Sequence, residues 1–328
     1  MTAKSGINVV LGTGIIGDKS VDKGARLDTP DEVQAFLDLF YDAGYRQIDT
    51  AQLYSLGAPG TCEPRLGAAG AGDKFIVDTK VISTTPGDHK KENVAKNIQA
   101  SLSALKMNRV NIEYLHRPDR STPFEETCEA MDEAFRQGKF KHFGLSNYTA
   151  DEVKQILDIC DRRGFVKPTV YQGQYNPIVR GGEKELFPLL RRNGIAFYAW
   201  SPAGGGFFAG NYKKIATGGR FDTDTLLGGM YTGLYVQPGI TAAPEKALAI
   251  ASKHGIGGHA AALRWTAFHS QLDPKYDDAV IIGASTQEQL TSNLEIIKAG
   301  PLPLDVVEAL DGLYKEVAAS GAEIPYHF

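Results

Sequence analysis

Eight short runs rich in β-branched and aromatic residues recur along the chain, and amphipathic segments or long loops follow them. The runs are NVVLG (8–12), YRQIDT (45–50), FIVDTK (75–80), VNIEYLH (110–116), FKHFGLS (140–146), PTVYQGQY (168–175), GIAFYAW (194–200) and DAVIIG (278–283). A repeat of roughly thirty residues with this alternation predicts parallel strands joined by helical crossovers. Eight such units predict an α/β fold, the (β/α)8 TIM barrel.

The amphipathic segments share one helix plan. Each begins with a threonine that is followed three residues later by Glu or Gln, which is the pattern of an N-terminal capping box. Apolar residues at helical spacing come next, and a glycine ends each segment. The starting threonines are Thr29, Thr122, Thr149 and Thr286, and Pro30 and Pro123 follow the first two.

The glycines of the first run have the spacing of a dinucleotide-binding turn. Gly12, Gly14 and Gly17 form a G-x-G-x-x-G pattern. That turn requires a helix to begin at the glycines, whereas Gly17 is followed by the polar, aperiodic DKSVDKGARLD. We therefore expect these glycines to allow a tight turn at the barrel rim instead of a Rossmann site.

Composition narrows the class of protein. The 328 residues carry a net charge of −4 with a pI near 6.0, so the chain has no general attraction to nucleic acid or to an anionic membrane. The absence of a long apolar run and the three widely spaced cysteines favour a cytoplasmic protein with small-molecule partners. We expect one domain over 1–328, with a long Gly- and Tyr-rich loop at about 202–240 over the barrel mouth.

Titratable side chains gather where the predicted strands end, which is the functional face of such a barrel. Asp49 ends the second run and is followed by Tyr54, Lys80 ends the third and His116 ends the fourth. Any one of them has an ordinary structural explanation, such as a helix cap or a hydrogen-bonded core histidine. Together an acid, a phenol, an amine and an imidazole predict a site for proton transfer.

Four separated motifs resemble the aldo-keto reductase superfamily over nearly the whole chain. They are IDTAQLYS, DTK, YLHRPD and FGLSNY, and TVYQGQYN, ELFPLLR, GRF and DAVIIGAS further resemble its aflatoxin-aldehyde reductase branch. The resemblance implies NADPH-dependent reduction of aldehydes or ketones to alcohols by hydride transfer, with no metal. It assigns the proton-donor role to Tyr54, an activating role to Lys80 and Asp49, and the orientation of the carbonyl to His116.

The proposed roles have a physical basis. Tyrosine has an ordinary pKa near 10, and an adjacent ammonium such as that of Lys80 favours phenolate and lowers this value. Asp49 keeps Lys80 charged and aimed. Negative charge that develops on the carbonyl oxygen can then be met by Tyr54 and His116.

The same resemblance implies a set of cofactor-binding residues. Amide and hydroxyl groups suit the nicotinamide carboxamide because they match its donor and acceptor without adding charge, and backbone amides at a helix start favour an anion. Ser146, Asn147 and Gln172 are assigned to the carboxamide, Trp200 to the nicotinamide ring, Ser201, Pro202, Gly204 and Gly205 to the pyrophosphate, and Gly283, Ser285, Gln289 and Asn293 to the adenosine phosphate. Arg220, within GGRFD, is a candidate for a phosphate or a carboxylate.

Three features depart from the branch. Asn211 stands where the branch usually has lysine, so Lys213 or Lys214 is expected to substitute for it. Arg117 follows the catalytic histidine where an apolar residue is common, and the IPYHF tail lacks the arginine of mammalian members. The resemblance therefore does not extend to recognition of acidic substrates by the C-terminus.

Two other function classes fit parts of the sequence. One is an NADPH-binding regulatory subunit with little turnover, against which the intact set of four catalytic residues argues. The other is a Schiff-base lyase that uses Lys80, although Asp49 should keep that amine protonated and a poor nucleophile. The physiological substrate and the reaction direction are not fixed by the sequence, and a homodimer is compatible with it.

Overall fold

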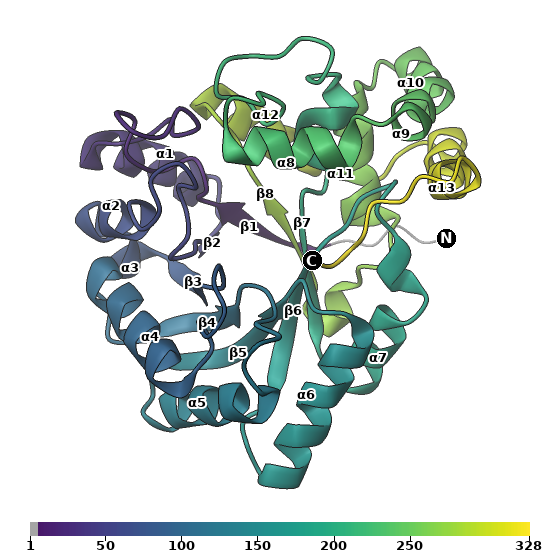
Figure 1. Ribbon diagram of the computed structural model, residues 1–328. Coiled ribbons are helices and arrows are strands. Elements are labelled where there is room, and N and C mark those ends of the chain that lie inside the picture. Colours follow the sequence, from purple (N-terminus) through teal and green to yellow (C-terminus); the bar gives the residue numbers. More distant parts are fainter. Residues whose placement is uncertain (1–5) are drawn as a thin grey trace.

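Eight parallel strands close into a barrel in the computed structural model, which describes residues 6–328 (Figure 1). Strand order follows the sequence, and β1 pairs with both β2 and β8. The strands are β1 (Asn8–Gly12), β2 (Gln47–Asp49), β3 (Ile76–Val81), β4 (Val110–Leu115), β5 (Phe140–Ser146), β6 (Pro168–Gln174), β7 (Ala196–Trp200) and β8 (Ala279–Ile282). The (β/α)8 barrel expected from the sequence is confirmed, and each of the eight apolar runs supplies one strand.

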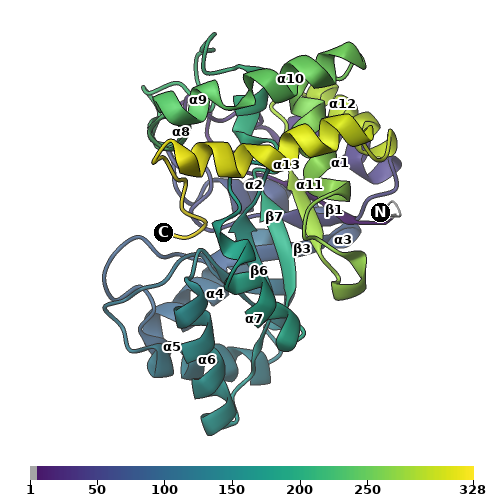
Figure 2. The same ribbon diagram turned by 90° about the vertical axis from the view of Figure 1, so that its right-hand side faces the viewer.

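Helices surround the barrel and bury the outer faces of its strands (Figures 1 and 2). The α-helices are α1 (Pro30–Asp42), α2 (Cys62–Ala68), α3 (Ala71–Lys74), α4 (Lys91–Leu105), α5 (Phe124–Arg136), α6 (Ala150–Arg163), α7 (Leu186–Arg192), α8 (Leu226–Tyr235), α9 (Pro238–Ala242), α10 (Pro244–Lys253), α11 (Gly258–Phe268), α12 (Gln287–Lys298) and α13 (Leu304–Ala319). Short 3₁₀ turns are η1 (Gly181–Glu183), η2 (Gly204–Ala209) and η3 (Pro274–Tyr276). Across residues 6–328, no helix combines the length and the apolar character needed to cross a bilayer.

Three of the four predicted helix caps are confirmed. Thr29 and Thr149 each form the full capping box, with Glu32 and Glu152 respectively, and the Thr286 side chain accepts from the Gln289 backbone N–H. The expected cap at Thr122 is wrong. Its hydroxyl donates to Asp119 at 2.7 Å, and the Pro123 that follows is the residue at which α5 is capped.

The barrel interior holds a cluster of apolar side chains together with polar ones. The apolar side chains that point inward come from five strands and are almost completely buried: Val10, Ile112, Tyr114, Val170, Ala196, Tyr198, Ala279 and Ile281. Because successive side chains alternate across a strand, Asp49 and Lys80 share this interior with them, whereas Ile48 and Val77 face the helices.

The segment expected as a long loop is only partly irregular. It contains η2, all of α8 and the start of α9, so helical segments interrupt the long loop expected over about 202–240. The glycines and tyrosines of α8 favour a loop in the sequence pattern. In the fold Tyr231 and Tyr235 are buried, and their rings stack with a centroid distance of 5.8 Å. The segment is hydrogen-bonded to the loop after β1, since the Arg26 guanidinium donates to the Thr217 carbonyl at 3.1 Å.

The three glycines of the first run are not followed by a helix, since α1 begins only at Pro30. None of them has a positive φ angle. Gly17 is required for a different reason: a Cβ there would lie 2.3 Å from the Ser55 Cβ, so only glycine lets the loop after β1 pack against the loop after β2. This close packing, more than a special turn, explains the glycine at the rim.

Candidate active site

Asp49, Tyr54 and Lys80 meet at the carboxyl ends of β2 and β3. The Lys80 Nζ lies 2.8 and 2.7 Å from the two carboxylate oxygens of Asp49 and 3.3 Å from the Tyr54 hydroxyl. The Tyr54 hydroxyl is also 3.4 Å from Asp49 Oδ2. The strand ends therefore bring together the acid, the amine and the phenol that the sequence predicts.

The ion pair is held rigidly in the barrel interior. The side chains of Lys80 and Asp49 are only 1% and 2% exposed. Lys80 donates a further hydrogen bond to the Thr50 carbonyl at 2.8 Å, and Gln172 Nε2 donates to Asp49 Oδ1 at 2.8 Å. A buried charge pair needs such additional partners to offset the loss of solvation, and they leave the ammonium aimed at the Tyr54 hydroxyl.

The ammonium stays protonated in this setting. Burial alone would lower the pKa of Lys80, but the negative charge of Asp49 and the hydrogen bonds to Asp49 and Tyr54 outweigh it and raise the pKa above its ordinary value. The expectation that Asp49 keeps Lys80 charged is thus consistent with the geometry.

The phenol of Tyr54 behaves differently from the simple expectation. Burial raises its pKa to about 12, because the loss of solvation outweighs the stabilisation of phenolate by Lys80. Lys80 does favour phenolate, yet the net pKa is raised and not lowered. Tyr54 is therefore protonated at neutral pH, as a proton donor must be, and the ammonium limits how weak an acid it becomes.

His116 completes the group from the end of β4. Its ring lies edge-on to that of Tyr54, with centroids 6.0 Å apart and planes inclined at 77°. Burial, together with Lys80 and Arg117, holds the pKa of His116 well below its ordinary value, so the imidazole is neutral. Its Nδ1 is buried and has no hydrogen-bond partner among residues 6–328, so the ring retains unused hydrogen-bonding capacity beside the phenol.

The residues assigned to the carboxamide line the adjoining strand ends. Ser146 and Gln172 are register partners on β5 and β6, and Asn147 follows with a φ of 65°. Asn147 Nδ2 donates to the His116 carbonyl at 2.9 Å, while its Oδ1 is buried without a partner among residues 6–328. Gln172 already uses its Nε2 on Asp49, so it also serves the ion pair, a role that the sequence did not indicate.

A glycine cradle follows β7. Trp200 ends the strand, Ser201 has a φ of 51° and hydrogen-bonds the Tyr231 hydroxyl, and Pro202 accepts a hydrogen bond from Thr266 at 2.8 Å. Gly204, Gly205 and Gly206 then all have positive φ angles, between 61° and 95°. A Cβ on Gly205 would lie 2.3 Å from the Tyr231 ring, so only glycine lets the backbone pack this closely against that ring.

The assigned residues after β8 build a compact turn. Asn293 is buried and uses both ends of its amide, donating to the Gly283 carbonyl at 3.0 Å and pairing with His259 at 2.7 Å. The Ser285 N–H donates to Gln289 Oε1 at 2.8 Å. These bonds order the start of α12, and they occupy the backbone N–H groups of Ser285 and Gln289 that the sequence offered for an anion.

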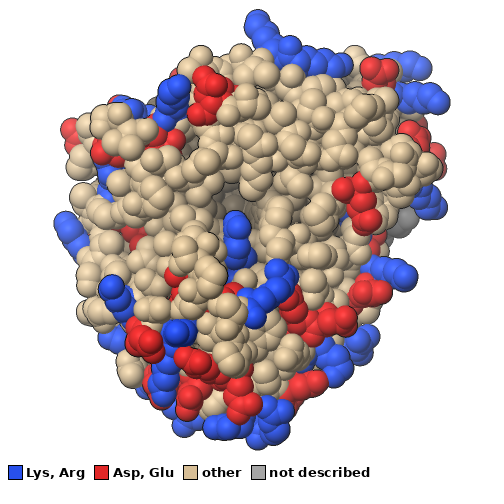
Figure 3. Space-filling view, in the orientation of Figure 1, with Lys and Arg blue, Asp and Glu red and all other residues tan. Residues whose placement is uncertain are grey.

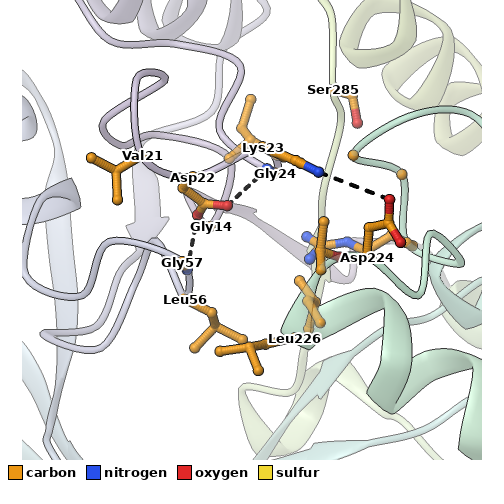
Figure 4. Close-up of a pocket in the computed structure, with 16 residues that line it drawn as sticks. Gly14, Val21, Asp22, Lys23, Gly24, Leu56, Gly57, Asp224, Leu226 and Ser285 are labelled. Carbon is orange, nitrogen blue, oxygen red and sulfur yellow. Dashed lines mark hydrogen bonds and ion pairs between the residues drawn. The ribbon is translucent and has the colours of Figure 1, made fainter.

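A cleft lies between the loop after β1 and the start of α8. Its lining includes Gly14, Leu56, Gly219, Arg220 and Ser285 (Figure 4). The face viewed in Figure 1 is hollowed at its centre, with basic side chains bordering the hollow (Figure 3). Arg220 makes no ion pair or hydrogen bond within residues 6–328; its guanidinium lies 5.8 Å from the centre of the Tyr231 ring.

The surroundings of the cleft fit a dinucleotide. The glycine cradle after β7 allows backbone to approach a phosphate closely, and the guanidinium of Arg220 is free to pair with one. The buried and unpartnered Asn147 Oδ1 supplies an acceptor for an amide near the ion pair. A cofactor with phosphates at one end and a carboxamide at the other would satisfy all three.

Comparison with known proteins gives the family of the chain. The model of the Aldo/keto reductase family matches residues 8–315. The chain belongs to the aldo/keto reductase family.

Named relatives agree with this assignment. An aldo-keto reductase of Pseudocercospora fijiensis is 40% identical over 88% of this chain and 99% of its own length. Human aflatoxin B1 aldehyde reductase member 4 is 38% identical over 89% of this chain and 91% of its own length, and human member 2 is 36% identical over 97% and 89%. As a member of the aldo/keto reductase family, the chain is an oxidoreductase.

The departures from the branch fall at the edge of the site in this aldo/keto reductase. Arg117 is exposed, makes no ion pair or hydrogen bond within residues 6–328, and lies 6.0 Å from the centre of the Phe328 ring, which stacks on Trp200 at 6.3 Å. Figure 1 shows the end of the chain over the centre of the barrel. Asn211 packs against Gly206 of the glycine cradle, and both Lys213 and Lys214 are exposed; their substitution for a lysine at position 211 stays a prediction.

Sequence reasoning missed several residues of the aldo/keto reductase site. Phe328 and Tyr231 give no signal in the sequence because tertiary packing alone brings Phe328 against Trp200 and Tyr231 against Ser201. Asp78 could have been found: it lies two residues before Lys80 in FIVDTK, so strand alternation places its carboxyl on the same inner face of β3.

Proposed function

We propose that this aldo/keto reductase uses NADPH to reduce aldehydes or ketones to alcohols. The observation that carries the proposal is the buried ion pair of Lys80 and Asp49, whose ammonium is 3.3 Å from the Tyr54 hydroxyl beside a cleft suited to a dinucleotide. Two of the relatives are named aldehyde reductases, which points the same way. NADPH, when bound, supplies the hydride.

Each side chain has one task in this proposal. Tyr54 donates its hydroxyl proton to the carbonyl oxygen of the substrate. Lys80 stabilises the negative charge that remains on the Tyr54 oxygen after the proton has left. Asp49 holds the ammonium in place through both oxygens. The neutral imidazole of His116 supplies a hydrogen bond that orients the carbonyl without adding a second positive charge.

The remaining residues would hold the cofactor. We assign the carboxamide to Ser146, Asn147 and Gln172 and the nicotinamide ring to the face of Trp200. The glycine cradle after Ser201 and Pro202 would take the pyrophosphate. The guanidinium of Arg220 would take the adenosine phosphate, beside the turn from Gly283 to Gln289 whose Ser285 lines the same cleft. Asn293 would act by ordering this turn, since its amide is fully used within the protein.

The Schiff-base alternative is disfavoured by the environment of the amine. A lyase requires an uncharged lysine nitrogen, whereas the pKa of Lys80 is raised by Asp49 and Tyr54. A regulatory protein with little turnover would need some defect in the catalytic group, and Asp49, Tyr54, Lys80 and His116 are all in place. The three free and buried cysteines suit a reducing compartment such as the cytoplasm.

The experiment that tests the proposal is NADPH consumption with a panel of aromatic aldehydes, dicarbonyls and short semialdehydes. We expect at least one class to be reduced with stoichiometric formation of the alcohol. Binding of NADPH without turnover of any member would favour the regulatory alternative. Trapping of substrate on Lys80 by borohydride would favour the lyase.

A further inference from the structure

A second carboxyl lies directly beside Asp49 inside the barrel. Asp78 on β3 is the register partner of Asp49 on β2. Its side chain is 0% exposed and faces inward, because it is two residues from the inward-facing Lys80. The two acids are thus neighbours on adjacent strands, with the catalytic ammonium near both.

The hydrogen-bond partners of Asp78 are neutral amides. Gln47 Nε2 donates to its Oδ2 at 2.7 Å and Asn111 Nδ2 to its Oδ1 at 2.8 Å. No ion pair to this carboxyl is found within residues 6–328. Asp49 already holds Lys80 at contact distance, so Asp78 has no cation of its own to offset its burial.

The other titratable groups that face Asp78 are the ion-paired Asp49 and Lys80 and two buried tyrosines. Asp49 and Lys80 are the charged pair, and burial raises the pKa of Tyr114 on β4 well above its ordinary range and that of Tyr198 on β7 to about 12. Burial, with a further contribution from Asp49, raises the pKa of Asp78 itself to about 7. Asp78 is the member of this cluster whose charge changes in the physiological range.

We propose that Asp78 is a positioning residue that sets the electrostatic balance of the Asp49–Lys80 pair, so that its protonation favours carbonyl reduction and its ionisation opposes it. The proposal rests on the function proposed above. It concerns a residue that makes no contact with substrate and acts through Lys80.

The direction of the effect follows from the charges. With Asp78 protonated, the Asp49–Lys80 cluster is neutral overall; with Asp78 ionised, it carries one net negative charge in a region of low dielectric. That charge opposes the negative charge that proton donation leaves on Tyr54 and that develops on the substrate oxygen. Since the carboxyl is protonated below its pKa, the rate of hydride transfer in the reducing direction should fall as the pH rises through about 7.

The first test measures the pKa of Tyr54 without cofactor or substrate. Tyrosinate absorbance is titrated in the parent and in Asp78→Asn, each corrected with the corresponding Tyr54→Phe background. Removing the carboxylate charge should lower the pKa of Tyr54 by roughly half a unit to one unit. An unchanged Tyr54 pKa overturns the proposal and leaves the proposed reductase activity unaffected.

Glu113 provides a matched control. It is a second fully buried carboxyl, on β4, but it alternates with the inward-facing Tyr114 and so faces the helices. Burial raises the pKa of Glu113 well above its ordinary value. Glu113→Gln should leave the Tyr54 pKa unchanged; an equal shift in this variant would show that the effect of Asp78→Asn is structural and would overturn the proposal.

The second test is the pH profile of single-turnover hydride transfer, with an aldehyde that the panel identifies. As the pH rises through the neutral range, the parent rate should fall by about three- to tenfold. This falling limb of the pH profile should be absent in Asp78→Asn and present in Glu113→Gln. Asn111→Ala keeps Asp78 but removes a hydrogen bond that favours its ionised form, so the limb should move to higher pH. Asn111→Ala tests the proposal even if Asp78→Asn does not fold. A falling limb that keeps its position in Asp78→Asn or in Asn111→Ala contradicts the proposal.

Discussion

Asp49 binds the ammonium of Lys80 through both carboxylate oxygens, at 2.8 and 2.7 Å, in a part of the barrel that solvent barely reaches. The two residues come from neighbouring strands, and each is the partner that makes the burial of the other tolerable. The pair is therefore both a structural and a chemical unit, and changes to it affect stability as well as catalysis.

The buried pair predicts a stability effect. Lys80→Met leaves Asp49 as an uncompensated buried charge, so we expect a loss of about 3–5 kcal/mol in the free energy of unfolding. Adding Asp49→Asn to that variant removes the stranded charge and should restore much of the loss. Urea unfolding of both variants measures this, and a double variant no more stable than Lys80→Met would mean that the charge is not the cause.

The guanidinium of Arg117, which has no ion-pair partner within residues 6–328, predicts a preference for acidic substrates. Arg117→Met should weaken turnover of 4-carboxybenzaldehyde more than that of benzaldehyde, because only the first can form a charge-assisted hydrogen bond. The comparison is made in kcat/KM at fixed ionic strength. An equal loss for both aldehydes would mean that Arg117 does not bind the substrate carboxylate.

Cofactor choice gives a third prediction. The free guanidinium of Arg220 and the adjoining Ser285 line the cleft, and they should favour the 2′-phosphate of NADPH over the hydroxyl of NADH. We expect NADPH to bind more tightly, with the difference shrinking in Arg220→Ala. Fluorescence quenching gives both dissociation constants, and equal values in the parent would remove this assignment.

A buried histidine outside the site predicts acid sensitivity. His89 is 0% exposed and pairs with Ser83 at 2.6 Å, and burial lowers its pKa to about 4. Between pH 6.5 and 4 the unfolded chain binds a proton that the folded chain does not, so stability is retained above 6.5 and lost as the pH falls. The contribution of His89 should be about 2 kcal/mol between pH 7.5 and 5. Urea unfolding at these two pH values should show a smaller loss in His89→Gln; an equal loss assigns the effect to other groups.

Much of the fold is predictable from the sequence because its strands and helix caps depend on residues that are close together in the chain. The eight strands follow from their apolar runs, and the caps at Thr29 and Thr149 follow from hydrogen bonds within one helical turn. The cap expected at Thr122 does not form because a tertiary partner, Asp119, takes its hydroxyl. Helix α8 was missed because its glycines and tyrosines suggest a loop, although Tyr231 and Tyr235 are buried by distant segments.

The candidate site shows the same division. Asp49, Lys80 and His116 could be placed together because parallel strands end at one face of a barrel. The direction of the Tyr54 pKa shift could not be predicted from the sequence. It depends on whether burial outweighs the effect of Lys80, and burial is a property of the folded chain. The second use of Gln172, as a donor to Asp49, likewise needs its distance.

The central claim is that Tyr54 donates the proton in carbonyl reduction, and the most direct measurement is the single-turnover rate of NADPH oxidation by Tyr54→Phe with the best aldehyde of the panel. The substitution removes one oxygen and keeps the ring, so NADPH affinity should be nearly unchanged while the rate falls by at least about 10². Combining it with Lys80→Met should cost far less than the product of the two separate losses, since both act in one proton-delivery unit. A folded Tyr54→Phe protein that binds NADPH and reduces the aldehyde within a few-fold of the parent rate would contradict the account.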